Sequence, residues 1–314
     1  MAKRDTGLRF QPAGGSKAVA VPTGKKQRLH IERLANDGRG IAFLDGRTWF
    51  VAGALADEDV EARVLGARSQ VVEARAERIF TSSAQRRVAP CAHAGQCGGC
   101  TLQHLPHSEQ LALKQRTLAE QLLRVAATAP EEWAPPLVGP EFAYRRRARI
   151  AVRWDVKSKQ LAVGFRAAAS QDIVAIADCP VLAPELMALL GPLRALLRAR
   201  LRDGQGAGIA LTLSDDGVDV LLANVSAEGL AAIEALTNFA DKHDLARLSV
   251  EGPGGIDTLV ERRQPVLTMG GVAVPLPVAP FLQATREGEA ALVAAVREAV
   301  GGAARVADLF CGLG

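Results

Sequence analysis

The sequence predicts a multidomain α/β protein with a small β-barrel in its N-terminal part, a mixed α/β centre and the beginning of a doubly wound α/β unit at its C-terminal end. Three observations predict this class. Several short strand-like runs occur within about 55 residues, from Gln27 to Phe80, which is typical of a small barrel. Helical and strand patterns are then mixed along the middle of the chain. Finally, an apolar run at Val306–Phe310 leads into a Gly-x-Gly turn, as in adenosyl-binding sheets.

The composition excludes several classes of protein. Of 314 residues, 48% are hydrophobic and 23% are charged, which excludes collagen-like, mucin-like and globally disordered chains. Five cysteines are too few for a disulfide scaffold. No apolar run is long enough to span a bilayer, and the first residues lack the apolar segment of a secretory signal. We therefore expect a cytoplasmic protein with no membrane partner.

The charge is distributed unevenly along the chain. Residues 1–200 hold 30 Lys and Arg against 19 Asp and Glu, whereas residues 201–314 hold 8 against 15. A basic first part favours a polyanionic partner that is bound mainly by that part. A solvated, arginine-rich surface explains the same numbers, so charge alone leaves both interpretations open.

The elements follow in order along the chain. Residues 1–25 lack periodicity and predict a disordered basic tail. The barrel is expected over 26–82, and its strongest signal is the Asp45-Gly46 hairpin turn. Helices are predicted near 109–126, 184–200, 227–240 and 288–300 from apolar residues at helical spacing. Strands of the later part are predicted near 147–154, 208–213, 218–223, 246–250, 266–269, 272–276 and 306–310.

The sharpest local motif is Cys91-x5-Cys97-x2-Cys100, in a glycine-rich loop that lets three thiolates converge. Three soft ligands need a fourth, and Cys179 in Asp-Cys-Pro is the candidate, because a proline recurs after iron–sulfur ligands. Four thiolates suit a [4Fe–4S] cluster or a structural zinc, and the spacing does not decide between them. A disulfide pair is the less favoured alternative in a cytoplasmic chain. His93 is expected to be a loop residue.

Three features together resemble one family. They are a barrel of the TRAM type, the Cys-x5-Cys-Gly-Gly-Cys motif with a distal Asp-Cys-Pro, and Phe281-Leu-Gln283 about 25 residues before the Asp308–Gly314 motif. The chain resembles the iron–sulfur branch of the RNA uracil-5-methyltransferases, the 23S rRNA (uracil-5-)-methyltransferases, from about Gln27 to its end. Residues 144–149 resemble the entry to a strand of the family's central domain. The cysteine motif argues against the similar tRNA branch, which lacks the cluster.

The resemblance implies a domain organisation. Four segments are expected: the tail over 1–25, the TRAM barrel (OB-like) over 26–82, a central α/β domain with the cluster over 83–108 and 140–279, and the start of a Rossmann-like methyltransferase domain over 109–139 and 280–314.

The resemblance also implies site residues. Cys91, Cys97, Cys100 and Cys179 would ligate a [4Fe–4S] cluster with a structural and RNA-binding role. Gln283 would lie at the S-adenosylmethionine and uracil site, Phe310 would contact S-adenosylmethionine, and Asp308, Gly312 and Gly314 would shape the turn. The family usually has Asn two residues after this Gln, where this chain has Thr285. Cys311 does not match the family's nucleophile motif and is interpreted as a turn residue.

The implied reaction is methyl transfer from S-adenosylmethionine to C5 of a uridine in 23S rRNA. Because C5 of uracil is a poor nucleophile, a cysteine thiolate adds at C6 and creates an enolate that takes the methyl group. A base then removes the C5 proton and the thiolate leaves. The family's nucleophilic Cys and base Glu lie beyond the position of Gly314. If these 314 residues are the whole chain, we therefore expect no catalytic nucleophile, no base and no methylation by this chain alone.

Two arginine- and lysine-containing patches are expected to bind 23S rRNA, with no DNA partner and a monomeric chain. On the barrel, the candidates for phosphate contacts are Lys25, Lys26, Arg28, Arg33, Arg39 and Arg47. Trp49 or Phe50 is the candidate for stacking on a base, and at least one of these two adjacent strand residues is expected in the core. The second patch is Arg145, Arg146, Arg147 and Arg149, for which a solvated strand face is the alternative.

Other functions use the same motifs. A non-catalytic iron–sulfur RNA-binding adaptor would need only the barrel and the cluster. An iron–sulfur radical or electron-transfer enzyme would be expected to show Cys-x3-Cys-x2-Cys or ferredoxin spacing, which this sequence lacks. A continuation of the gene past Gly314 that contains a Ser-Cys-Asn-Pro-like strand end would favour the enzyme over the adaptor.

Overall fold

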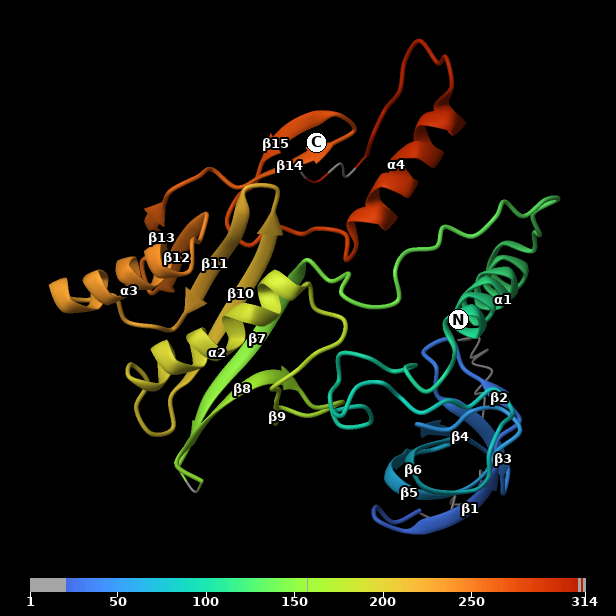
Figure 1. The fold of residues 1–314 in the computed structure, drawn as a ribbon. Coiled ribbons are helices and arrows are strands. Elements are labelled where there is room, and N and C mark those ends of the chain that lie inside the picture. Colours follow the sequence, from blue (N-terminus) through green and yellow to red (C-terminus); the bar gives the residue numbers. More distant parts are fainter. Residues whose placement is uncertain (1–20, 157, 310–311, 313–314) are drawn as a thin grey trace, which may run out of the picture. The chain divides into compact units, whose positions relative to one another are not determined.

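The computed structural model describes residues 21–156, 158–309 and 312, which form two compact units (Figure 1). The first unit contains the described residues up to Arg87 together with His104–Glu109. The second contains Val88–Gln103 and the described residues from Gln110 onwards. Most of the predicted tail, and also Phe310, Cys311 and Gly314, lie outside the described residues.

The first unit is a six-stranded sheet that closes on itself. Its strands are β1 (Lys26–His30), β2 (Arg33–Leu34), β3 (Gly40–Leu44), β4 (Arg47–Ala52), β5 (Asp59–Arg68) and β6 (Val71–Thr81), in the order β1-β5-β6-β4-β3-β2. β1 pairs with β5 and β2 pairs with β3, so the single segment 26–34 joins the two edges of the sheet. The predicted hairpin forms at Asp45 and Gly46, whose φ angles of 53° and 69° suit a type I′ turn.

Trp49 lies in the core of this closed sheet. Its side chain is 3% exposed and packs in the cluster that contains Leu29, Val51 and Val60. Our assignment of Trp49 as a base-stacking residue is therefore wrong, because adjacent strand residues face opposite ways and here Trp49 is the one that faces inwards. Phe50 is half-buried and carries the Arg39 guanidinium 4.6 Å from its ring centroid.

The second unit contains a seven-stranded sheet covered on one face by two helices (Figure 1). Its strands are β7 (Arg147–Asp155), β8 (Gln160–Arg166), β9 (Ile173–Ala175), β10 (Gly206–Ser214), β11 (Gly217–Ala223), β12 (Arg247–Gly252) and β13 (Gly255–Glu261), in the order β13-β12-β11-β10-β7-β8-β9. The helices are α2 (Pro184–Arg198) and α3 (Leu230–Lys242). The strand predicted near 147–154 forms as β7, and leucines of α2 pack in one core with its Ile150 and Val152.

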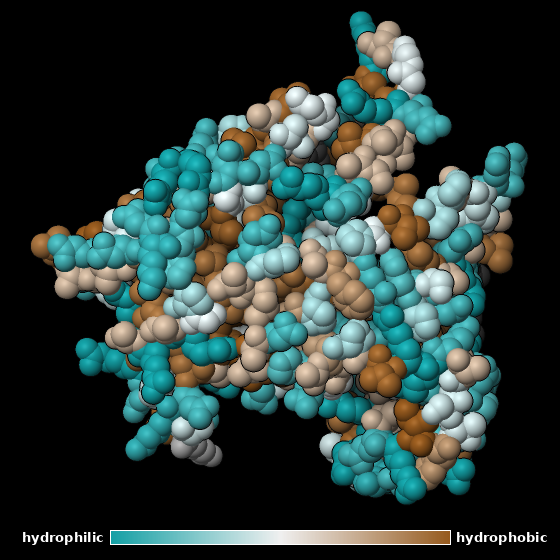
Figure 2. All heavy atoms as spheres, in the orientation of Figure 1, coloured by the Kyte–Doolittle hydropathy of each residue, from teal (hydrophilic) through white to brown (hydrophobic). Residues whose placement is uncertain are grey.

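The remaining elements are α1 (His107–Ala126), the hairpin of β14 (Val266–Met269) and β15 (Val272–Pro275), and α4 (Arg286–Val300). α1 buries only Leu113, and α4 buries no residue. Hydrophobic side chains interrupt a mostly hydrophilic surface in Figure 2. The large exposed apolar residues include Leu118, Leu123 and Val125 of α1 and Leu292 and Val296 of α4. None of the described helices combines the length and the apolar character needed to cross a membrane.

The predicted strand at 306–310 is wrong for its described part. Residues 306–309 form no strand, and Val306 and Leu309 are exposed. A strand needs a neighbour that accepts and donates its backbone hydrogen bonds. No described residue pairs with this segment, because the nearby hairpin β14–β15 pairs only with itself.

Candidate functional site

The cysteine loop is anchored to the end of β8 by its backbone. Gly98 N–H donates to the Arg166 carbonyl at 2.9 Å, and Ala168 N–H donates to the Gln96 carbonyl at 3.2 Å. Between these bonds, Cys97 forms an antiparallel bridge with Ala167. A Cβ atom on Gly98 would lie 3.0 Å from the Arg166 carbonyl oxygen, so glycine permits this close approach. The loop therefore has a fixed position on the second unit.

Cys179 follows β9 in the chain, and the close packing of β9 against β8 brings this part of the chain towards the cysteine loop. Gly164 of β8 pairs with Ala175 of β9, and a Cβ atom at Gly164 would lie 1.9 Å from the Val174 carbonyl oxygen. The four thiols Cys91, Cys97, Cys100 and Cys179 line one cavity of about 310 Å³, which we call the cysteine cavity.

Backbone N–H groups point at the sulfurs of this cavity. His93 N–H donates to Cys91 Sγ and Gly99 N–H donates to Cys97 Sγ, each at 3.4 Å. Gln103 accepts a hydrogen bond from Cys91 N–H at 3.1 Å and fixes the start of the loop. All four cysteines are free, so the structure does not pair them as disulfides. N–H groups that donate to sulfur in this way orient and stabilise thiolates that bind a metal group.

Electrostatics in the cavity disfavour four bare thiolates. Burial raises the pKa of the Cys97, Cys100 and Cys179 thiols, and the neighbouring thiols raise these values further. A cation held among the sulfurs would remove this penalty. Among the described residues, no group of three or more His, Cys, Asp or Glu side chains is arranged to hold a metal ion. Four sulfur donors are chemically suited to a metal group that prefers sulfur ligands. The four thiols border a cavity and are not arranged around one ion.

Three of the four predicted arginines of the second patch border the cysteine cavity. Arg145, Arg147 and Arg149 line it together with Asp178. Burial, followed by the neighbouring charge of Arg149, lowers the pKa of Arg147, which shows that these guanidiniums repel one another. The Arg147 guanidinium also lies 5.7 Å from the ring centroid of Phe281, which is 74% exposed. Positive charge thus lies next to the thiols, and an exposed aromatic ring lies beside Arg147.

Arg146 has a different environment, and its assignment as an RNA contact is wrong. Its side chain is 4% exposed and forms an ion pair with Glu289 of α4. Its Nε donates to the Gln283 carbonyl oxygen at 3.1 Å. In an extended chain, consecutive side chains point to opposite sides, so the run of three arginines could not form a single outward patch.

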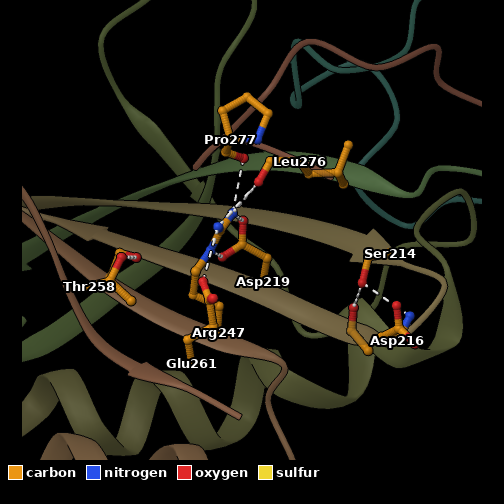
Figure 3. A network of polar contacts seen from close by, with 10 residues as sticks. Ser214, Asp216, Asp219, Arg247, Thr258, Glu261, Leu276 and Pro277 are labelled. Carbon is orange, nitrogen blue, oxygen red and sulfur yellow. Dashed lines mark hydrogen bonds and ion pairs between the residues drawn. The ribbon is translucent and has the colours of Figure 1, made fainter. Parts of the chain in front are cut away.

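Residues 276–289, which we call the Gln283 segment, connect β15 to α4 and are held to the sheet at both ends. Near its end, Arg146 binds Gln283 and Glu289. At its start, the buried Arg247 of β12 donates to the Leu276 carbonyl at 3.2 Å and to the Pro277 carbonyl at 3.0 Å (Figure 3). Arg247 is itself held by the Asp219 carboxylate at 3.0 and 2.9 Å. No sequence pattern pointed to Arg247, because an isolated arginine in a strand is usually a surface residue.

Side chains alternate along the Gln283 segment. Leu282 is buried against Leu267 and Leu276, whereas Phe281 and Gln283 are exposed. Thr285 is the N-cap of α4 and accepts a hydrogen bond from Gly288 N–H at 2.8 Å. This residue, which departs from the family's usual Asn, therefore has a structural role here.

The predicted turn at the C-terminal motif is described only in part. Asp308 is exposed, and Gly312 has a φ of 69°, a left-handed conformation that favours glycine. Phe310 and Gly314 lie outside the described residues, so the turn as a whole stays a prediction.

The candidate cations of the first unit differ in how far neighbouring carboxylates neutralise them. Lys26 pairs with Glu61 at 3.1 Å and with Glu77 at 2.9 Å. Arg39 pairs with Asp37 at 2.8 Å. Arg28 instead stacks on the ring of Phe80, 4.6 Å from its centroid. Lys25 and Arg33 are exposed, and Arg47 begins β4.

Comparison with known proteins gives three results. A TRAM domain model matches residues 21–76. The 23S rRNA (uracil(1939)-C(5))-methyltransferases RlmD of Pseudomonas fluorescens strains Pf0-1 and Pf-5 are 55% and 56% identical to this chain; the matches cover all of it and 68% and 70% of those relatives. A crystal structure of the Pyrococcus abyssi tRNA (uracil-54, C5)-methyltransferase, in complex with S-adenosyl-L-homocysteine, matches with a TM-score of 0.62 at 20% identity. It covers 88% of this chain and 65% of that protein, and shows that the two share a fold.

Proposed function

Because the chain belongs to the family of 23S rRNA uracil-C5 methyltransferases, we propose that it takes part in S-adenosylmethionine-dependent methylation of uridine 1939 of 23S rRNA at C5. The position is the one in the names of its relatives. The observation that carries the proposal is the juxtaposition on the second unit of four thiols, Arg145, Arg147 and Arg149, and the exposed Phe281 beside Arg147. This face offers positive charge for phosphates and an aromatic ring for an unstacked base.

The cysteine cavity holds a [4Fe–4S] cluster in this proposal. An all-sulfur donor set with N–H groups aimed at two sulfurs supports it. Four thiolates also suit a tetrahedral zinc. The proposal takes the cluster because the Cys-x5-Cys-Gly-Gly-Cys motif resembles the iron–sulfur branch of the family. The four cysteines would hold the cluster between the 91–100 loop and the chain after β9, and Arg145, Arg147 and Arg149 would offset its negative charge.

In the reaction, Gln283 contacts S-adenosylmethionine and the target uracil, and Phe310 contacts S-adenosylmethionine beside a turn formed by Asp308, Gly312 and Gly314. A cysteine thiolate adds to C6 of the uracil, so that C5 can attack the methyl group. A base then removes the C5 proton and the thiolate leaves. We assign neither that thiolate nor that base to any residue of this chain.

The segments 109–139 and 280–314 belong to the methyltransferase domain in this proposal. Exposed apolar side chains on α1 and α4 support it, since a helix that buries one residue or none leaves an apolar face for a further packing partner. The first unit binds RNA, as supported by the TRAM match. We place the monomeric protein in the cytoplasm, where 23S rRNA is its partner.

The first test is anaerobic purification followed by an absorbance spectrum and metal analysis. We expect a brown protein with broad absorbance near roughly 400 nm and about four irons per chain. A colourless protein with one zinc would contradict the cluster. Binding of a 23S rRNA fragment that contains uridine 1939 is measured on the same sample. Failure to bind it in low salt would contradict the proposed substrate.

A further inference from the structure

An exposed aromatic ring on the first unit carries two guanidinium groups. Arg28 of β1 lies 4.6 Å, and Arg78 of β6 lies 4.9 Å, from the ring centroid of Phe80. Phe80 itself is 41% exposed. The strand registers place both arginines opposite Glu61 of β5, so they stand in one row across β1, β5 and β6.

A β-bulge directs Phe80 to this position. Thr81 pairs with Asp59 and Ile79 pairs with Val60, which leaves Phe80 as the extra residue of β6. Bulges re-aim a side chain, and they are conspicuous beside functional sites. The large ring therefore lies under the two arginines instead of entering the core.

The carboxylates of this face are occupied by other cations. Glu61 and Glu77 pair with Lys26, Glu77 also pairs with Arg63, and Asp59 interacts with His30 at 3.1 Å. Within residues 21–156 and 158–309, neither Arg28 nor Arg78 forms an ion pair, although Arg28 acts on Asp59 at longer range.

The other arginine stacked on a ring of this unit differs in this respect. Arg39 lies over Phe50, but Asp37 binds its guanidinium at 2.8 Å. Among the described residues of the first unit, the ring of Phe80 is therefore the one that presents guanidinium N–H groups with no carboxylate bound to them.

We propose that Arg28, Phe80 and Arg78 form a phosphate-binding site for the RNA backbone. A guanidinium that stacks on a ring keeps its N–H edge free, and that edge matches two phosphate oxygens. Phe80 carries no charge and contributes by holding both arginines in place before RNA binds, which lowers the entropy cost of binding. The inference rests on the proposed function, because it takes RNA as the ligand.

The test measures binding of the full chain to a fluorescein-labelled 23S rRNA fragment that contains uridine 1939, by anisotropy, between about 50 and 200 mM salt. Arg28→Ala and Arg78→Ala should each weaken binding about fivefold and lower the slope of log affinity against log salt by about 0.7–0.9, the loss of one phosphate contact. Phe80→Ala should weaken binding about fivefold and leave the salt slope unchanged, because the two arginines lose the ring that holds them in place but keep their charges. Phe80→Trp, which keeps a ring under the guanidiniums, should restore affinity.

Two matched variants serve as controls. Arg68→Ala removes an exposed arginine of β5, and Phe43→Ala removes a ring of β3 that is 52% exposed and carries no stacked guanidinium among the described residues. Both should bind RNA as the unaltered chain does, and unchanged circular dichroism should show that all variants fold.

The outcomes separate the site from the broader proposal. If the unaltered chain binds the fragment, but Arg28→Ala and Arg78→Ala behave like Arg68→Ala, the site is overturned and the proposed function stands. If Phe80→Ala lowers the salt slope, its role in ordering the arginines is overturned. If the unaltered chain does not bind RNA, both the site and the proposed RNA substrate are overturned.

Discussion

Charged side chains on the surface of the first unit differ in their partners from the buried and cavity-lining arginines of the second unit. On the first unit, Lys26, Arg63, Glu61 and Glu77 pair with one another at the surface, where the Arg63 guanidinium lowers the pKa of Glu77 to about 2. In the second unit, Arg146 and Arg247 are buried and fix the Gln283 segment, while Arg147 and Arg149 repel each other beside the cysteine cavity. A count of charges therefore says little about RNA binding until each charge is assigned a partner.

The largest effect is expected at the cysteine cavity. Cys179→Ser should abolish most of the bound iron and the absorbance near roughly 400 nm, because one of four thiolate ligands is lost. Iron analysis of the anaerobically purified protein checks this. Cys311→Ser, at a cysteine outside the proposed ligand set, should retain its iron; equal loss in both variants would contradict the assignment of ligands.

The buried and surface ion pairs offer the next comparison. Arg146→Met should lower the free energy of unfolding by about 3 kcal/mol, because it leaves Glu289 and the Gln283 carbonyl without their partner. Arg63→Met, which breaks the exposed pair with Glu77, should have a much smaller effect, because solvent screens this pair. Urea unfolding measures both, and similar costs would show that burial does not distinguish the two pairs.

Two glycines within strands sharpen the comparison further. Gly164→Ala should destabilise the protein by about 2 kcal/mol and reduce its iron content, since the new methyl group would force β9 away from β8. Gly66→Ala on β5 meets no atom within 4 Å and should be neutral or slightly stabilising. Thermal unfolding and iron analysis provide the check. An unchanged iron content in Gly164→Ala would contradict the idea that the position of β9 determines iron binding.

A smaller effect is expected from pH on the first unit. Burial lowers the pKa of His104 from 6.5 to about 4. The unfolded chain therefore binds this proton more readily, and stability should fall as the pH drops from about 6.5 to 4, by about 2 kcal/mol after allowance for partial exposure. His104→Gln should remove this component of the pH dependence of urea unfolding. An identical pH dependence in both proteins would exclude His104 as its source.

Much of the fold follows from local sequence patterns. The hairpin at Asp45-Gly46, the strand β7 and the leucines of α2 are each specified by turn chemistry or periodicity, and each is confirmed. β8 and β13 were not predicted. In β8 the small residues Ala162 and Gly164, rather than polar ones, separate the alternating large apolar residues, and β13 shows no clear alternation. The strand predicted at 306–310 does not form in its described part, since an apolar run without a pairing partner does not form a strand.

The candidate site was predictable where chemistry constrains the residue type. The four cysteines come together in one cavity, although Cys179 is distant in sequence. Arg146 and Trp49 were misassigned because residue type alone does not show which way a strand side chain points. Arg78 and Phe80, which we propose as RNA contacts, could not be predicted from local patterns, because the contact between them depends on a β-bulge.

The contact of Arg247 with Leu276 and Pro277 also has a consequence for the order of folding. Arg247 belongs to β12, and its guanidinium is oriented by Asp219 of the parallel neighbour β11. The Gln283 segment can therefore dock only after this parallel pair has formed, which needs a long-range crossover and is intrinsically slow. During synthesis from the N-terminus, this segment emerges after the strands that hold it. Its resistance to proteolysis would thus report when the sheet of the second unit is complete.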